Sequence, residues 1–131
     1  DGDKDIGKQL VEPTRIYVKE VMNLIKQVEV HGIAHITGGG LDNINRINDN
    51  FQYLIDNPLP VPPVFDWLQE KGSIEDKEMY RTFNMGMGMI IIVNKNDAEK
   101  SVSILGEHAQ IIGSVRNGKG VEHKQVATEL A

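Results

Sequence analysis

The fold of this chain is decided by the stretch His31-Gly-Ile-Ala-His-Ile-Thr-Gly-Gly-Gly-Leu-Asp-Asn-Ile-Asn-Arg46. It predicts a short buried strand, a turn of three glycines and a helix that begins at Leu41. Consecutive glycines lose much backbone entropy on folding, so they mark positive φ angles or a close approach to the backbone. The N-terminus of a helix presents unpaired N–H groups and the positive end of its dipole. The stretch therefore predicts a bound anion, a phosphate or a carboxylate, at the glycine turn.

Two polar side chains on the expected helix favour this interpretation. Helical spacing places Asn43 and Arg46 on one side and Leu41 and Ile44 on another, so that the polar pair lies beneath the turn. Arg46 would offer a forked donor to the same anion. The alternative is a tight corner between strand and helix with Arg46 in solvent, because a glycine triplet is a weak phosphate signal. The pattern alone leaves both interpretations open.

A second block, Glu78-Met-Tyr-Arg-Thr-Phe-Asn-Met-Gly-Met-Gly-Met-Ile-Ile-Ile-Val93, joins a charged helix end to a Gly-x-Gly turn and an apolar strand. Two further segments are Glu12-Pro-Thr-Arg-Ile-Tyr-Val18 and Val64-Phe-Asp-Trp-Leu-Gln69. With residues 31–46, they closely resemble the C-terminal domain of phosphoribosylformylglycinamidine cyclo-ligase, the aminoimidazole ribonucleotide synthetase of purine biosynthesis. One departure is Met85, where relatives commonly have cysteine, and it argues against an essential thiol there.

The resemblance implies a ligase that uses ATP to convert formylglycinamidine ribonucleotide to aminoimidazole ribonucleotide. In that family ATP phosphorylates the formyl oxygen, and an amidine nitrogen then attacks the carbon to close the imidazole ring. ATP and magnesium are held chiefly by acidic and glycine-rich motifs of an N-terminal domain, which are missing here. The resemblance also implies a cytoplasmic enzyme that is a homodimer when it is full length.

The domain organisation follows from the same resemblance. Residues 9–131 are expected to be the substrate-side, C-terminal domain of a two-domain synthetase, with the active site in the cleft between the domains. The charged residues 1–8 are expected to be a linker, and the fragment is expected to be inactive alone. Two alternatives stay open: a domain of a related enzyme such as formylglycinamidine synthetase or selenophosphate synthetase, or a non-catalytic binding module.

The candidate site combines the two glycine-containing blocks. His35 is the candidate catalytic residue, because histidine exchanges protons near neutral pH. The residues expected to bind the substrate or its phosphate are Thr37, Gly38, Gly39, Gly40, Asn43, Arg46, Arg81, Thr82 and Asn84. The alternatives are a hydrogen-bonded core histidine for His35 and an ion pair with Glu78 for Arg81. A metal site at His31 and His35 is not expected, since no nearby spacing supplies a third ligand.

Composition sets limits on the class of protein. The chain has 131 residues, of which 40% are hydrophobic and 25% charged, as expected of one compact domain. A net charge of −5 argues against binding to nucleic acid or to an anionic membrane surface. The absence of cysteine excludes a disulfide framework and a thiol nucleophile. No apolar run approaches the ~18 residues of a membrane span.

Hydrophobic periodicity predicts an α/β (α+β) layered domain with a mixed central sheet flanked by helices. Helices are expected over residues 13–28, 41–47, 64–71, 74–83 and 96–108, and strands over 30–37, 51–55, 89–94, 109–116 and 121–126. The apolar run 89–94 is typical of a strand covered on both faces. Asn117-Gly118 predicts a hairpin between the last two strands. The family resemblance implies a partial ferredoxin-like topology.

Overall fold

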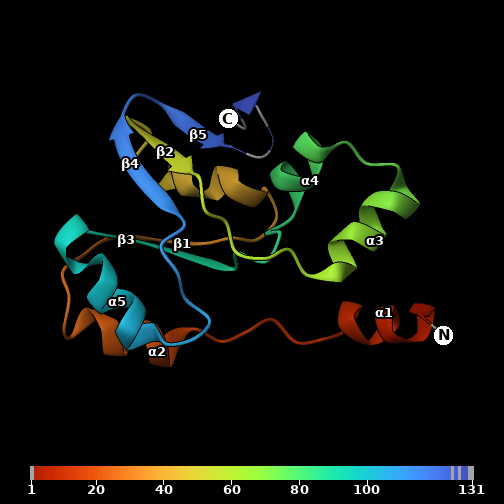
Figure 1. Cartoon of the computed structure of the whole chain (residues 1–131), viewed down its shortest axis with the longest axis horizontal. Helices are drawn as coiled ribbons and strands as arrows, with labels where there is room; N and C mark the ends of the chain where they lie inside the picture. Colours follow the sequence, from red (N-terminus) through yellow and green to blue (C-terminus); the bar gives the residue numbers. More distant parts are fainter. Residues whose placement is uncertain (1, 125, 127, 130–131) are drawn as a thin grey trace.

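The computed structural model describes residues 2–124, 126 and 128–129 of the chain (Figure 1). Its helices are α1 (Gly2–Leu10), α2 (Val18–Ile25), η1 (Gly40–Arg46), α3 (Pro63–Gly72), α4 (Asp76–Thr82), η2 (Lys95–Asp97) and α5 (Ala98–Leu105), where η marks a 3₁₀-helix. Its strands are β1 (Val30–His35), β2 (Phe51–Ile55), β3 (Met89–Val93), β4 (Gly113–Asn117), β5 (Gly120–His123) and β6 (Thr128–Glu129). The mixed α/β class that the sequence predicts is confirmed.

The strands form two small sheets in place of one central sheet. β1 pairs with β3 in an antiparallel ladder, and the second sheet has the strand order β4-β2-β5-β6. β2 runs antiparallel to β4 and parallel to β5. The predicted hairpin is therefore wrong, because β4 and β5 pair with the two edges of β2 instead of with each other. Gly113 permits the close approach of β4 to β2, since a Cβ atom there would overlap the carbonyl oxygen of Leu54.

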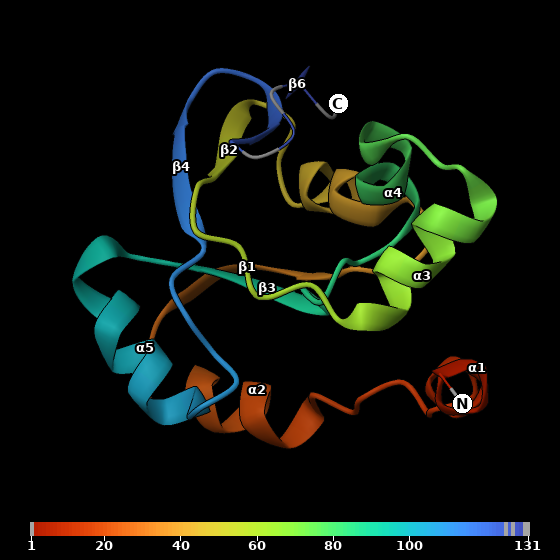
Figure 2. The same cartoon turned by 45° about the vertical axis from the view of Figure 1, so that its right-hand side comes forward.

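The β1–β3 sheet lies in the middle of the molecule. α2 and α5 lie side by side on one side of it, while the four-stranded sheet, η1 and α4 lie on the other (Figure 1, Figure 2). The core fills the space between the sheets and η1, and its members include Ala34, Leu41, Ile44, Ile55 and Val121. Alternating apolar positions of the strands and the apolar stripe of η1 are buried together here, which positions the glycine turn between β1 and η1.

β1 is buried on one face only, so the prediction of a buried strand is wrong. Ala34 and the following Ile36 are buried, whereas His31, Ile33 and His35 are exposed on the opposite face. The alternation does place both histidines on the same face, as predicted.

The first helices differ from the sequence prediction. The helix expected over residues 13–28 is shorter, because α2 spans Val18–Ile25 and leaves Pro13 in the preceding extended segment. Residues 1–8, expected to be a linker, have helical backbone from Gly2 onward in α1, which lies against α3. The domain boundary at residue 9 stays a prediction. Within the described part of the chain, no helix is long and apolar enough to cross a membrane.

Candidate functional site

The glycine turn is held by close contact with the end of α4. Gly39 and Gly40 have left-handed backbone, with φ of +100° and +53°. Gly40 is buried, and a Cβ atom there would overlap the carbonyl oxygen of Tyr80 and lie 2.8 Å from the carbonyl carbon of Arg81. Backbone conformation and lack of space therefore both require glycine at this position. The contact places the backbone of Arg81 against the turn.

Gly38 differs from the two glycines that follow it. It is exposed, has no atom within 4 Å of a Cβ position, and does not have a left-handed φ. The backbone N–H groups of Gly38 and Gly39 donate no hydrogen bond to another described residue, whereas that of Gly40 donates to the carbonyl oxygen of Thr37 at 2.9 Å. The fold thus explains Gly39 and Gly40 but gives no reason for glycine at position 38.

The side chain of Asn43 supports the turn through hydrogen bonds to its backbone. Its side-chain nitrogen donates to the carbonyl oxygen of Gly40 at 2.6 Å, with longer contacts of 3.5 Å to the carbonyl oxygens of Thr37 and Gly38. The residue is only 5% exposed. The amide nitrogen of Asn43 thus bonds to the backbone of the turn itself.

The helix after the turn is a 3₁₀-helix, and this changes the position of Arg46. Gly40 and Arg46 are the first and last residues of η1, and a rise of ~2.0 Å per residue separates their backbones by about 12 Å. Arg46 is exposed at the end of η1 that is distant from the turn. Asn43 and Arg46 are three residues apart and so project from the same side of η1, but Asn43 is buried and bonds to the turn, whereas Arg46 is exposed at the far end of the helix.

The residues at the end of α4 have different partners. Arg81 is exposed, and it forms no ion pair with another described residue. The expected alternative partner, Glu78, instead accepts a hydrogen bond from the hydroxyl of Thr82 at 3.0 Å. Asn84 accepts a hydrogen bond from the backbone N–H of Gly86 at 3.0 Å and so shapes the Gly-x-Gly turn. Among these side chains, that of Arg81 is exposed and forms no hydrogen bond or ion pair with another described residue, and its backbone lies next to the glycine turn.

His35 lies beside the second glycine turn. The backbone N–H of Ile36 donates to the carbonyl oxygen of Gly88 at 2.9 Å, which joins the end of β1 to this turn. The ring of Tyr17 meets the ring of His35 edge-on, with a centroid distance of 6.0 Å. The Tyr17 hydroxyl occupies the space that a Cβ atom at Gly88 would need. His35 is exposed, so the alternative of a core histidine is wrong.

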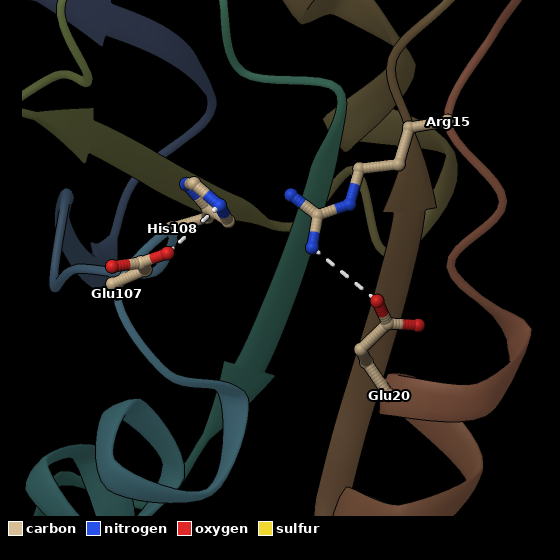
Figure 3. Close-up of polar contacts among 4 residues, drawn as sticks. All are labelled: Arg15, Glu20, Glu107 and His108. Carbon is tan, nitrogen blue, oxygen red and sulfur yellow. Dashed lines mark hydrogen bonds and ion pairs between the residues drawn. The ribbon is translucent and has the colours of Figure 1, made fainter.

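Arg15 completes this cluster and was not assigned a role from the sequence. Its guanidinium carbon lies 5.4 Å from the centroid of the Tyr17 ring, within cation–π range. It also pairs with Glu20 at 3.3 Å (Figure 3). A hydrogen bond with its own backbone and the bond from Arg15 lower the pKa of Glu20. Arg15 and Tyr17 belong to the segment 12–18 that carries the family resemblance, which was the available signal.

The groups behind the glycine turn are neutral at physiological pH. Burial raises the pKa of Tyr80, and Asp76 and Asp66 raise it further. The ring of His123 lies 4.4 Å from that of Tyr80, is 0% exposed, and has no hydrogen-bond partner for either nitrogen among the described residues. Burial lowers the pKa of His123. These two rings pack against each other behind the turn.

A cavity of about 770 Å³ lies apart from the predicted site. It is bordered by α2, α5, β3 and the chain around residues 108–115, and none of the predicted site residues lines it. Arg15 and Tyr17 are among the residues that line it. Most of the predicted site residues are exposed, whereas Gly40 and Asn43 are buried and Asn84 is half-buried. No group of three or more His, Cys, Asp or Glu side chains in the described ranges is arranged to hold a metal ion.

The family described as AIR synthase related protein, C-terminal domain, matches residues 1–125. The chain belongs to this family. The match covers both glycine turns, the end of α4 and the segment that contains Arg15 and Tyr17, so all of the candidate residues lie within the AIR synthase related domain.

Several curated relatives of this AIR synthase related domain carry the same name. Phosphoribosylformylglycinamidine cyclo-ligase of Methanopyrus kandleri is 48% identical over 120 residues, which is 90% of this chain and 35% of that protein. The protein of that name from Methanocaldococcus jannaschii is 48% identical over 118 residues, 86% of this chain and 33% of the relative. That from Syntrophus aciditrophicus is 47% identical over 124 residues, 90% of this chain and 36% of the relative. The chain thus spans about a third of the length of these relatives.

Proposed function

We propose that this domain is the C-terminal part of an ATP-dependent cyclo-ligase that converts formylglycinamidine ribonucleotide to aminoimidazole ribonucleotide. The observation that supports this most strongly is the identity of 44–48% to relatives named phosphoribosylformylglycinamidine cyclo-ligase. These names also favour the cyclo-ligase over formylglycinamidine synthetase or selenophosphate synthetase. In the reaction, ATP phosphorylates the formyl oxygen, the amidine nitrogen attacks the carbon, and phosphate leaves.

The partners of the domain are part of the same proposal. The remaining two-thirds of such an enzyme would include the N-terminal domain, which binds ATP and Mg²⁺. The chemistry proposed for this domain uses its backbone N–H groups and side chains. The complete protein is proposed to be a cytoplasmic homodimer. The fragment is proposed to be inactive alone, with its substrate-binding surface facing the N-terminal domain.

We infer that the phosphate of the substrate or of the nucleotide binds in front of Gly38 and Gly39. Glycine at position 38 is explained if a ligand approaches the backbone too closely for a side chain, since the fold itself imposes no such requirement. The N–H groups of both residues, which donate to no other described residue, supply donors, and the exposed side chain of Arg81, whose backbone lies against the turn, supplies a charged, forked donor. Thr37 borders the turn, while Asn43 and Gly40 fix its shape.

His35 is proposed to accept the proton that the amidine nitrogen loses when it attacks the activated carbon. It is exposed at the end of β1, two residues before Thr37, and Tyr17 holds its ring from one side. A histidine in contact with solvent and substrate can exchange a proton near neutral pH. Thr82 and Asn84, which bond within the chain, are proposed to position Arg81 and the Gly-x-Gly turn.

The test uses the intact two-domain enzyme with formylglycinamidine ribonucleotide and ATP, and measures the aminoimidazole ribonucleotide formed. Arg81→Ala is expected to raise KM for the ribonucleotide about 10-fold or more, because a hydrogen bond to a charged group contributes about 1.5–3 kcal/mol. Arg46→Ala is the matched comparison, since Arg46 lies at the other end of η1 and should have the smaller effect. Unchanged kcat and KM in Arg81→Ala would contradict the binding of an anion at this turn.

A second pair of variants tests the proton transfer. His35→Ala is expected to lower kcat by about 100-fold or more, the typical contribution of a general base. His31→Ala is the control, because His31 is exposed on the same face of β1 but lies further from the turn. Equal kcat values for the two variants would show that His35 has no special role. Absence of ring closure by the intact wild-type enzyme would refute the proposed function itself.

A further inference from the structure

β3 is an edge strand that has the sequence of a central strand. Its residues Met-Ile-Ile-Ile-Val are apolar at every position, which is typical of a strand that is covered on both faces and paired on both edges. In the structure, β1 pairs with one edge of β3, and no other described strand pairs with the second edge. Natural edge strands are usually protected by a charge, a proline or a bulge. β3 itself contains neither a charged residue nor a proline, so its sequence does not fit an edge position.

The cavity of about 770 Å³ runs along this free edge. It touches all five residues of β3 and none of β1, so it lies on the side of β3 that is opposite to its partner strand. α2 and α5 form one wall, through side chains that include Leu24 and Val102. β2 and β4 form another wall, through side chains that include Leu54 and Val115. The cavity is therefore apolar on the two sides that would cover the faces of an added strand.

Polar side chains, among them the charged pair Arg15 and Glu20, border this cavity at the protein surface. Arg15 and Glu20, which line it, form an ion pair and are 44% and 36% exposed (Figure 3). His108 lines it as well, pairs with Glu107 at 3.5 Å, and is 66% exposed. An apolar interior with charged groups at its border is the arrangement expected where a segment of chain enters from solvent.

We propose that a β-strand of the cyclo-ligase from outside residues 1–131 occupies this cavity and pairs with the free edge of β3. The proposal rests on the proposed function in one respect, namely that this domain is part of a longer enzyme. The chain spans about a third of its relatives, so the rest of such an enzyme has ample length to supply a strand. Pairing with the five residues of β3 needs a strand of about 17 Å.

The walls of the cavity determine the composition of this strand. Apolar side chains of the two helices would cover one of its faces, and those of β2 and β4 would cover the other. The added strand should therefore be a continuous apolar run rich in Val, Ile and Leu, and not an alternating apolar and polar one. Backbone hydrogen bonds to β3 fix its register, as in other cases of strand addition to a sheet edge.

Amide hydrogen exchange of Met89–Val93 tests the proposal by comparing the isolated chain with the intact enzyme. In the isolated chain, the amides of β3 that face away from β1 should exchange rapidly. In the intact enzyme, the same amides should exchange about 100-fold more slowly, because they are then hydrogen-bonded inside a sheet. β2 is the internal control, since it is paired on both edges within this chain and should change little. Equal exchange of β3 in the two samples would overturn the proposal.

A pair of variants in α5 gives a second measurement. Val102 lines the cavity, whereas the adjacent Ser103 is exposed and does not. In the intact enzyme, Val102→Lys should restore rapid exchange in β3, and Ser103→Lys should leave β3 protected. Equal protection of β3 in both variants would overturn the proposal. Protection of β3 in the isolated chain that increases with protein concentration would also overturn it, because the occupant of the cavity would then be a second copy of the chain. These experiments measure amide exchange and not enzyme turnover. A failure of the proposed strand pairing can therefore be distinguished from a failure of the proposed ring-closing activity.

Discussion

Alanine in place of Gly40 is expected to destabilise the domain strongly, because two separate costs act at this position. A residue with a side chain loses about 1–2 kcal/mol in the left-handed region, and Gly40 has a φ of +53°. The new methyl group would also overlap the carbonyl oxygen of Tyr80, with the carbonyl carbon only 2.9 Å away. Forcing a methyl group into a closely packed site costs about 1–3 kcal/mol. Together these costs lower the free energy of unfolding by about 2–5 kcal/mol.

Gly38→Ala is the matched control, because it makes the same chemical change two residues away in open space. No atom lies within 4 Å of its Cβ position. Its effect on the free energy of unfolding should stay within about 0.5 kcal/mol, or be slightly stabilising through the lower entropy of the unfolded chain. Urea denaturation of the wild type and the two variants measures the difference, with the slope m checked for constancy. If the two variants agreed within about 0.5 kcal/mol, the contact between the turn and α4 would be wrong.

Three further predictions concern the site and its support. In the intact enzyme, Gly38→Ala should raise KM for the ribonucleotide without lowering the melting temperature; an unchanged KM would contradict close approach of a ligand to this residue. Asn43→Ala should lower the free energy of unfolding by about 1–3 kcal/mol, since the buried carbonyl oxygen of Gly40 loses its donor; urea denaturation checks this. The free energy of unfolding should also fall as the pH drops below the ordinary histidine pKa of 6.5, because burial lowers the pKa of His123 and only the unfolded chain then takes up the proton. His123→Phe should remove this contribution, and urea midpoints measured across a pH series will show whether the wild type and the variant diverge.

Local sequence determined most of the helices and strands. The alternation over residues 51–55 and the apolar run that begins at Met89 predict β2 and β3 at nearly their observed bounds. The helical patterns on the two sides of Gly72 likewise predict α3 and α4. These elements were predictable because each one's apolar residues recur at the period of its own backbone. The family was predictable as well, because its long motifs occur in the same order in this sequence and can be recognised without a structure.

The candidate site was predictable in part. The sequence singled out the glycine turn, His35 and Arg81, and the structure brings the backbone of Arg81 to the turn through Gly40. It could not show that Asn43 bonds to the turn itself, since this depends on the path of the backbone through η1. Nor did it assign Arg15, whose contact with Tyr17 depends on the fold of an extended segment without periodicity. The roles of these residues in binding and catalysis stay predictions.

The tertiary structure alone decided which strands are neighbours. Asn117-Gly118 favours a local hairpin, but β2 lies between β4 and β5 and takes the hydrogen bonds of both. Such pairing joins residues that are 58 to 68 positions apart in the chain, and no short-range pattern encodes which edges meet. The apolar run of β3 shows the complementary case, because its sequence indicates a partner on each edge while the described fold supplies one. The sequence of a strand indicates whether its faces are buried or exposed. Which strands pair with it depends on the tertiary structure.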